Sequence, residues 1–168
     1  MMTPAFNSRP RWHLWVLLAA ALTAADQVIK HFVIATMPLQ SSIPVTPWFN
    51  WVHVLNTGAA FSFLANEDGW QRYFFSGLGM LVSAGLMYWL WRGLQSRLET
   101  AACIALTGGA MGNVVDRIRL GAVVDFLDFH WKDWHWPAFN LADVFVVSGA
   151  ALFILASRER TPPDQTES

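Results

Sequence analysis

The feature that most restricts this sequence is an uncharged apolar run between Arg72 and Arg92, YFFSGLGMLVSAGLMYWLW. Its length is close to the roughly 20 residues that an α-helix needs to cross the hydrocarbon core of a bilayer. No charged side chain interrupts the run, as hydropathy analysis asks of a spanning segment. We therefore predict a transmembrane helix over about residues 71–91.

Three further stretches are apolar but are shorter or contain charges, such as Asp26 and Lys30 in the first of them. Charged residues make up only 14% of the chain and hydrophobic residues 54%, against about 25% charged in an ordinary soluble domain. We therefore expect one integral membrane domain over 1–168, an all-α bundle of four transmembrane helices. The three additional helices are predicted over about 12–35, 99–116 and 139–157.

The distribution of arginines predicts the orientation of this bundle. With four spans both chain ends share one side, and three pairs of arginines lie there, which favours a multi-pass topology with both termini inside. These are Arg9 and Arg11, Arg92 and Arg97, and Arg158 and Arg160. Residues 158–168 are expected to be a polar cytoplasmic tail. A cleaved secretory signal is the alternative for the N-terminus, but an uncleaved first span accounts for more of the sequence.

The two segments assigned to the outer side, about 37–70 and 117–138, contain strand-like stretches. WFNWVHVL in the first and VVDFLDFHW in the second are rich in aromatic and β-branched residues, a composition typical of strands. NTGAAFSFL, which follows the first of these stretches, supplies a turn and then a short helix at the interface. We expect a small extracytoplasmic β-sheet cradle on the outer surface of the membrane.

Polar side chains from three predicted helices converge on one end of the bundle. Asp26 lies about 22 Å along the first helix from Arg11, at a rise of about 1.5 Å per residue, which places it in the outer half. The third helix ends with polar residues as it reaches the outer face, and the fourth begins with them as it leaves. The converging residues are Asp26, Asn113, Asp116, Asn140 and Asp143, with Asn56 and Asp125 in the outer segments.

Some of these residues have an ordinary structural explanation. Asp26 and Lys30 have the spacing of an intrahelical ion pair. Asp116 is compatible with an interfacial anchor or with a structural hydrogen-bond network, and Asp143 with stabilisation of the first turn of its helix. An ionisable residue near lipid nevertheless costs roughly 2.5–3.5 kcal/mol at the bilayer centre and by default marks a functional site.

Several classes of chemistry find no support in the sequence. There is no GxSxG elbow for a serine hydrolase and no HExxH zinc motif, and His130 and His135 are not expected to bind a metal. The net charge of −1 lacks the basic surface that nucleic acid requires. Neither a metal nor another cofactor is therefore expected.

Paired carboxylates remain as a route to hydrolysis. Two carboxyl groups held close together share one proton, so that one acts as general base towards water and the other donates to the carbonyl oxygen. Asp125 ends the strand-like VVD and Asp143 begins a helix, both at the outer rim where water is available. Composition alone leaves the pair open among Asp26, Asp116, Asp125, Asp128, Asp133 and Asp143.

Five short motifs together resemble bacterial lipoprotein signal peptidase, or signal peptidase II, over about residues 20–155. They are DQVIK, NTGAAF, GNVVDR, VVDF and FNLAD, in that order. The resemblance implies an intramembrane aspartic endopeptidase of the bacterial cytoplasmic (inner) membrane, with its active site near the outer face. Such an enzyme removes the signal peptide from prolipoproteins by cutting before the diacylglyceryl-modified cysteine. Its partners would be these substrates and membrane lipid, and we expect a monomer.

The resemblance also implies residue roles. Asp125 and Asp143 would be the catalytic dyad, and a short helix near residues 58–66 would cover the site. The positive end of the fourth helix favours the ionised form of Asp143 and therefore Asp125 as the holder of the shared proton. Residues lining the site or contacting substrate would be Asn56, Gly58, Asn113, Arg117 and Asn140, and residues holding the architecture would be Asp26, Lys30 and Asp116.

Two other functions are compatible with intramembrane carboxylates. A small proton-coupled transporter uses them as a proton relay, but here the acids gather at one face and the inner halves of the predicted helices are nearly free of ionisable groups. A purely structural membrane-assembly protein would not require so many polar residues at one place.

Overall fold

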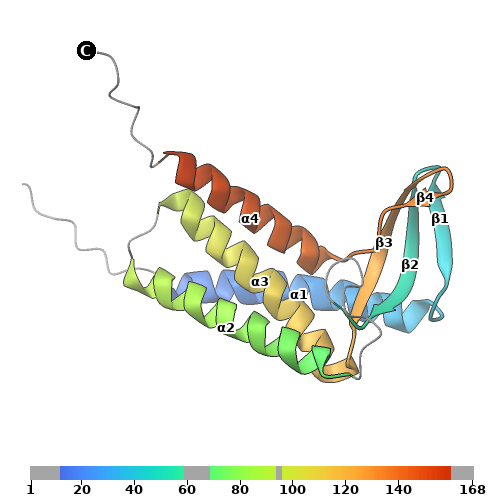
Figure 1. Ribbon diagram of the computed structural model, residues 1–168, viewed down its shortest axis with the longest axis horizontal. Helices are drawn as coiled ribbons and strands as arrows, with labels where there is room; N and C mark the ends of the chain where they lie inside the picture. The colour runs from blue at the N-terminus through green and yellow to red at the C-terminus, as the bar shows by residue number, and fades with distance from the viewer. Residues whose placement is uncertain (1–11, 59–68, 94–95, 160–168) are drawn as a thin grey trace, which may run out of the picture.

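The computed structural model describes residues 12–58, 69–93 and 96–159 of the chain. Within them, four long helices form a bundle and a small sheet lies at one end of it (Figure 1). Each helix is long and apolar enough to cross a membrane, as the sequence predicts. The helices are α1 (Trp12–Thr36), α2 (Gln71–Arg92), α3 (Arg97–Leu120) and α4 (Leu141–Glu159).

Helix α3 extends further than the sequence predicts. It continues one turn past Asp116 to Leu120, so Arg117 lies on the helix and not in an outer segment. The expected boundary followed the edge of the apolar run, but a helix can continue beyond the hydrocarbon. What ends α3 is Gly121, whose left-handed φ of 77° suits glycine because it has no Cβ.

The other end of α3 is defined by a capping box. The Ser96 side chain accepts a hydrogen bond from the Glu99 backbone N–H (3.2 Å), and the Glu99 carboxylate accepts from the Ser96 N–H (2.7 Å). This reciprocal pair satisfies two backbone donors that the first helical turn leaves without partners. The start of the helix is therefore a local property of the sequence.

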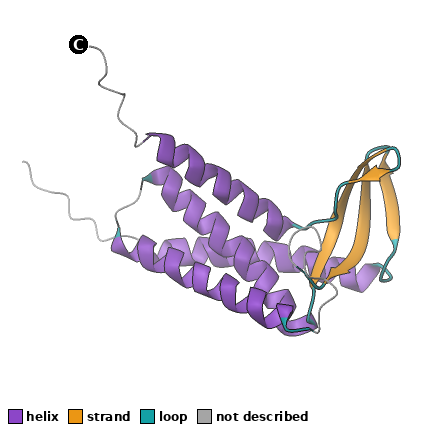
Figure 2. Cartoon of the chain, in the orientation of Figure 1, coloured by secondary structure: helices purple, strands orange, loops and turns teal. Residues whose placement is uncertain are grey.

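The sheet, drawn in orange in Figure 2, contains four antiparallel strands in the order β1-β2-β3-β4. The two predicted strand segments form its centre, and β1 and β4 are its edges. Because α2 and α3 separate β2 from β3 along the chain, their pairing brings distant segments together. The strands are β1 (Ser42–Thr46), β2 (Phe49–Asn56), β3 (Val123–Trp131) and β4 (Trp134–His135).

The C-terminal end of α1 supports this sheet. Val33 of α1 and Met37, the residue that follows the helix, form a buried apolar cluster with Val124 and Phe126 of β3. Burial of these side chains removes apolar surface from water. The contact places the start of β3 beside the C-terminal end of α1.

Helix α3 is central and packs against the other three helices. Glycines permit this close approach: a Cβ on Gly109 would lie 2.4 Å from the Ala142 carbonyl oxygen, and a Cβ on Gly112 would lie 2.7 Å from Asp26 Oδ2. Small residues at a helix interface let the backbones come together in this way. At Gly112, α1, α3 and the start of α4 therefore meet.

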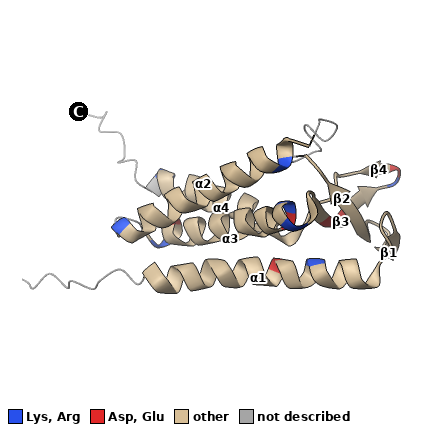
Figure 3. Cartoon of the chain, turned by 90° about the horizontal axis from the view of Figure 1, so that it is seen from below, with Lys and Arg blue, Asp and Glu red and all other residues tan. Residues whose placement is uncertain are grey.

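Large apolar side chains cover the outside of the bundle, among them Val28 of α1, Leu81 of α2 and Val147 of α4, which are 68%, 71% and 69% exposed. Figure 3 shows the charged residues gathered at the two ends, apart from one stretch of α1. The first residue of α1 and the last of α4 lie at the end away from the sheet (Figure 1). The expected short helix near 58–66 falls outside the described residues except for Gly58, as does the tail beyond Glu159.

Candidate active site

A cavity of about 450 Å³ lies at the sheet end of the bundle and brings together side chains from four elements. Asp125 of β3 and Asp143 of α4 both line it. Three further residues expected at the site also line it, namely Asn56, Asn113 and Arg117. Asn140 is fully buried and bonds to Asp125, so the structure gathers the polar residues from the distant motifs into one site.

The β2–β3 register places Asn56 beside Asp125. Val54 lies opposite Asp125, and Asn56 lies opposite Val123, so Asn56 and Asp125 are diagonal neighbours on one face of the sheet. The Asn56 Nδ2 donates to Asp125 Oδ2 at 3.2 Å. The carboxylate is 2% exposed and its surroundings are therefore defined by protein groups.

Asp143 and Asn140 form a reciprocal cap on α4. Asn140 precedes the helix, and its Oδ1 accepts from the Asp143 backbone N–H at 3.0 Å, while Asp143 Oδ2 accepts from the Asn140 N–H at 3.2 Å. This arrangement corresponds to a capping box with asparagine and aspartate in the two roles. The prediction that Asp143 opens the fourth helix is confirmed.

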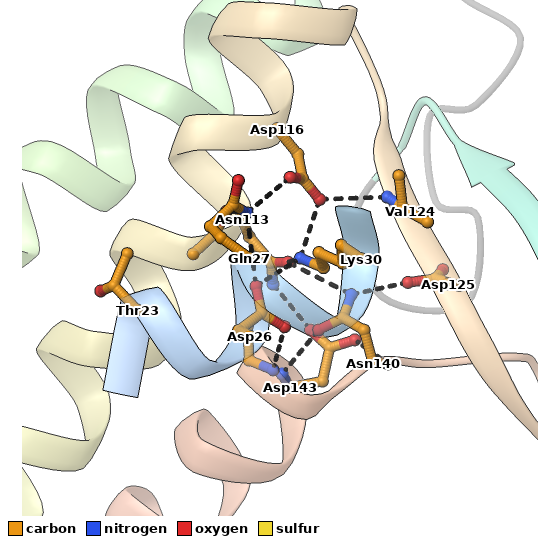
Figure 4. A network of polar contacts seen from close by, with 12 residues as sticks. Thr23, Asp26, Gln27, Lys30, Asn113, Asp116, Val124, Asp125, Asn140 and Asp143 are labelled. Carbon is orange, nitrogen blue, oxygen red and sulfur yellow. Dashed lines mark hydrogen bonds and ion pairs between the residues drawn. The ribbon is translucent and has the colours of Figure 1, made fainter. Parts of the chain in front are cut away.

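Two side-chain amides connect the aspartates (Figure 4). The Asn140 Nδ2 donates to Asp125 Oδ1 at 2.7 Å and is also 3.2 Å from Asn113 Oδ1. The Asn113 Nδ2 donates to Asp143 Oδ1 at 2.8 Å. Each carboxylate therefore receives at least two hydrogen bonds from neutral donors, which stabilise its negative charge.

A buried ionic cluster lies behind these amides. Lys30 Nζ is 2.8 Å from Asp26 Oδ2 and 2.8 Å from Asp116 Oδ2. The predicted pair of Asp26 and Lys30 is thus confirmed, but it is half of a triad that joins α1 to α3. Gln27 adds a bond from Nε2 to Asp116 Oδ1 at 2.7 Å, a contact that sequence reasoning missed because an uncharged glutamine next to Asp26 carries no distinguishing signal.

Burial is the main electrostatic influence on Asp125. Loss of hydration, together with the neighbouring charge of Asp143, raises the pKa of Asp125 to about 7. The hydrogen bonds from Asn140 and Asn56 and the charge of Lys30 oppose this rise. Desolvation is the larger effect because it penalises the charged form directly. Asp125 is therefore a carboxyl group that holds a proton close to neutral pH.

Arg117 lies on the α3 turn that the sequence placed in a loop. Its NH2 group donates to the Gly58 carbonyl oxygen at 2.8 Å, and its guanidinium carbon lies 5.3 Å from the centre of the Phe75 ring. Gly58 in turn donates its N–H to Asn56 Oδ1 at 3.0 Å. Arg117 and Gly58 thus join the end of β2 to α3 at the margin of the cavity.

The other aspartates that the sequence left as candidates for a catalytic pair do not line this cavity. Asp128 accepts from Asn50 Nδ2 at 2.8 Å and contacts His135 Nδ1 at 2.9 Å, and it does not line the cavity. Asp26 and Asp116 are bound to Lys30. In the part of the chain that the structure describes, no group of three His, Cys, Asp or Glu side chains is placed to hold a metal.

The rest of the cavity wall is mainly apolar and follows two segments. One is the connection from β4 to α4, and the other is the first two turns of α4, where Val147 is 69% exposed on the outside of the bundle. The cavity therefore extends from the carboxylates towards the exposed apolar surface of α4. Its apolar lining comprises Val123, Trp136, Pro137, Ala138, Phe139, Val144, Val146 and Val147.

Comparison with known proteins gives consistent results. Residues 18–158 match the family described as signal peptidase (SPase) II. A lipoprotein signal peptidase of Serratia marcescens is 50% identical over 142 residues, which cover 83% of this chain and 82% of that protein. A lipoprotein signal peptidase of Cupriavidus necator is 47% identical over 147 residues, with 88% and 84% covered.

Two solved structures, each described as a bacterial membrane enzyme, share the fold. The first superposes with a TM-score of 0.82 at 28% identity and covers 98% of this chain and 99% of its own. The second has a TM-score of 0.78 at 29% identity, with 94% and 100% covered. The expected combination of four apolar helices and a small sheet is thereby confirmed, and the sheet is antiparallel.

Proposed function

Because this chain belongs to the signal peptidase II family, we propose that Asp125 and Asp143 are the catalytic dyad with which it removes signal peptides from prolipoproteins. Membership confirms the predicted family and makes the protein a peptidase. Its four apolar helices and its likeness to a membrane enzyme make it a multi-pass membrane protein. The transporter alternative receives no support from these relatives.

One observation carries the assignment of the dyad. Asp125 and Asp143 line the same cavity and both interact with Asn140. Two carboxyl groups in a shared, largely desolvated site do not readily ionise together, so they hold one proton between them. Of the acids that sequence analysis left open, these two alone line this cavity in the described part of the chain.

The different burial of the two aspartates supports a different role for each, since Asp125 is buried and Asp143 is half-buried. Donors from Asn113 and from the Asn140 backbone stabilise a negative charge on Asp143, whereas burial raises the pKa of Asp125 to about 7. Asp143 therefore takes a proton from water as the water oxygen attacks the scissile carbonyl carbon. Asp125 gives its proton to the carbonyl oxygen at the same step.

Collapse of the resulting tetrahedral adduct completes the reaction. Asp143 passes its newly acquired proton to the amide nitrogen, the carbon–nitrogen bond breaks, and Asp125 recovers its proton from a hydroxyl of the adduct. The carboxylic acid and amine products leave, and the dyad again holds one proton. The cycle uses no group beyond the two aspartates and water.

The shape of the cavity suggests how a lipid-modified substrate binds. Its apolar wall leads from the dyad to the lipid-facing side of α4, so acyl chains on a diacylglyceryl cysteine can remain in lipid while the preceding peptide bond lies at the carboxylates. The sheet end would then face outward from the bacterial inner membrane. Both termini would lie inside, and the chain would act as a monomer.

Replacement of each aspartate tests the proposal. Purified Asp125→Asn and Asp143→Asn proteins should be folded and unable to cleave a diacylglyceryl-modified prolipoprotein peptide in detergent or proteoliposomes. Asp128→Asn is the matched control, because Asp128 is a buried aspartate of the same strand outside the cavity, and this variant should retain cleavage. Retained activity in either dyad variant would overturn the assignment.

A further inference from the structure

The triad centred on Lys30 contacts the backbone next to each aspartate of the proposed dyad (Figure 4). Asp116 Oδ2 accepts from the N–H of Val124, the residue before Asp125, at 3.1 Å. Asp26 Oδ1 accepts from the N–H of Ala142, the residue before Asp143, at 2.9 Å. Since Lys30 bridges Asp26 and Asp116, one buried ammonium group links β3 and α4 immediately behind the dyad.

The third contact of Lys30 determines which way the Asn113 side-chain amide is turned. Its Nζ lies 3.0 Å from Asn113 Oδ1. An ammonium group only donates hydrogen bonds, so the atom of Asn113 that faces it must be the carbonyl oxygen. The amide NH2 group then points the other way and donates to Asp143 Oδ1 at 2.8 Å. Lys30 has three N–H bonds, and Asp26, Asp116 and Asn113 accept them.

The orientations of the other two amides, Asn140 and Asn56, are also set by a donor to the amide oxygen, but in each case that donor is a backbone N–H. Asn140 Oδ1 accepts from the Asp143 N–H, and Asn56 Oδ1 accepts from the Gly58 N–H. Their NH2 groups are consequently turned towards Asp125. Of these three amides, Asn113 is the one whose orientation depends on a side-chain donor, and that dependence can be tested by substitution.

We propose that Lys30 is a positioning residue for the dyad, because it keeps the Asn113 amide turned so that its NH2 group donates to Asp143. The inference rests on the proposed function, since it assumes that Asp143 works as half of a dyad. Without the ammonium group only the longer contact from Asn140 Nδ2, at 3.2 Å, holds the Asn113 oxygen, and Asn140 Nδ2 already donates to Asp125. The amide can then turn over and present its oxygen to the Asp143 carboxylate. Two acceptors would then face each other, which disfavours the singly ionised dyad required for catalysis.

Other charged groups surround this contact and must stay constant in a test. Asp125 of β3 and Arg117 of α3 face Asp143, while Asp26 of α1 and Asp116 of α3 lie behind Asn113. Removal of Lys30 alone would leave two uncompensated buried carboxylates, which strongly destabilises a protein. The single variant is therefore unsuitable, because loss of folding would hide any effect on catalysis.

A charge-matched pair of variants reduces this difficulty, because only Asp116 then lacks a counter-charge and it keeps its hydrogen bonds from Gln27 and the Val124 N–H. Asp26→Asn/Lys30→Met removes one charge of each sign, and the new asparagine retains an oxygen that can accept from the Ala142 N–H. Asp26→Asn/Lys30→Gln has the same charge but restores a neutral N–H donor at position 30. The comparison between Met and Gln therefore isolates the hydrogen bond to Asn113 from the electrostatic effect of the lysine.

The decisive measurement is the pH profile of cleavage of a diacylglyceryl-modified peptide. In the Met variant we expect kcat to fall about tenfold, with KM little changed, and the acid limb of the profile to move to higher pH by about one unit, as loss of one charge-assisted hydrogen bond implies. The Gln variant should return the acid limb to its parental position. Should the Met variant not fold, a displaced limb in the folded Gln variant would overturn the proposal.

Thr23→Val provides the stability control. Thr23 lies two turns before Lys30 on α1 and donates from Oγ1 to the Gly108 carbonyl of α3 at 2.9 Å, so this isosteric change weakens the same helix pair without touching the dyad. It should lower thermal stability and leave the pH profile unchanged. Identical profiles for the Met and Gln variants would show that Lys30 has only an architectural role. If Asp125→Asn and Asp143→Asn are inactive at the same time, the proposed function stands and this inference alone fails.

Discussion

The side chain of Asn140 donates a hydrogen bond to Asp125 across 2.7 Å and, at its other end, accepts one from the backbone N–H of Asp143 at 3.0 Å. One fully buried amide therefore connects β3 to the first turn of α4. Because its carbonyl oxygen is used by a backbone donor, its NH2 group is directed at Asp125. The same residue caps a helix and organises the proposed dyad.

Replacement of Asn140 by alanine should therefore reduce both stability and activity. Loss of an N-cap costs about 0.5–2 kcal/mol, and loss of a preorganised donor in an active site costs roughly 10²-fold in kcat. Ser96→Ala is the control, because it removes the cap of α3, whose side-chain oxygen accepts from Glu99. It should lower the thermal midpoint similarly while cleavage is retained. Equal loss of activity in both variants would contradict a specific role for Asn140.

The raised pKa of Asp125 makes stability depend on pH. Its pKa is about 7 in the folded protein and about 3.9 in an unfolded chain. Between these values the folded state binds more protons, so the free energy of unfolding should fall as pH rises from about 4 to about 7 and then level off. The contribution is on the order of a few kcal/mol. Thermal midpoints of Asp125→Asn and the parent should therefore diverge, with the variant gaining relative stability at pH 8 compared with pH 5.

The close contact at Gly112 should not tolerate a methyl group. A Cβ there would lie 2.7 Å from Asp26 Oδ2 and 3.0 Å from the Ala142 Cβ, so Gly112→Ala must displace α1 or the start of α4. Overpacking of this kind costs roughly 1–3 kcal/mol. Gly77→Ala on α2 is the control because nothing lies within 4 Å of its added Cβ, and it should be neutral or slightly stabilising. Thermal unfolding and cleavage assays of both proteins test this contrast.

Arg117 should not be replaceable by lysine. Its guanidinium donates to the Gly58 carbonyl and lies against the Phe75 ring, and a lysine offers neither the planar group nor the fork of donors. We expect Arg117→Lys to lower kcat/KM for the lipid-modified peptide by about tenfold, the equivalent of one hydrogen bond to a charged group. Arg119→Lys on the same turn, where the side chain is exposed and bonds to Gln27, should be nearly silent. Similar losses in both variants would contradict a specific role for the Arg117 guanidinium.

Much of the fold could be predicted because its signals are local. The uncharged run that forms α2 and the strand-like VVDFLDFHW that forms β3 are recognisable from a few neighbouring residues. The end of α3 was less predictable, because the helix continues past the apolar run until Gly121 provides a left-handed stop. Hydropathy shows where an apolar run ends, whereas a helix ends where the backbone leaves the helical conformation, and the two positions need not coincide.

The site was predictable as a set of residues and unpredictable as a set of contacts. Convergence of carboxylates and amides on one end of the bundle followed from helix length and direction, and the resemblance to a known family suggested which two acids form a pair. The participation of Gln27 in the network and the two backbone bonds made by Asp26 and Asp116 came only from the structure. Nothing in the sequence around Lys30 indicates that Asp116, far along the chain, shares its ammonium group.

The amino-acid sequence by itself therefore determined that this chain forms four apolar helices and that polar side chains collect at one end of the bundle. It also determined that the two central strands lie in the segments that follow the first and third helices along the chain. These outcomes depend on hydrophobicity and periodicity, which are properties of short segments. Only the tertiary structure decided how Asn56, Asn113 and Asn140 are turned and which oxygen each N–H meets. An amide has nearly the same shape in its two orientations, so the choice between them depends on donors brought from distant segments by packing.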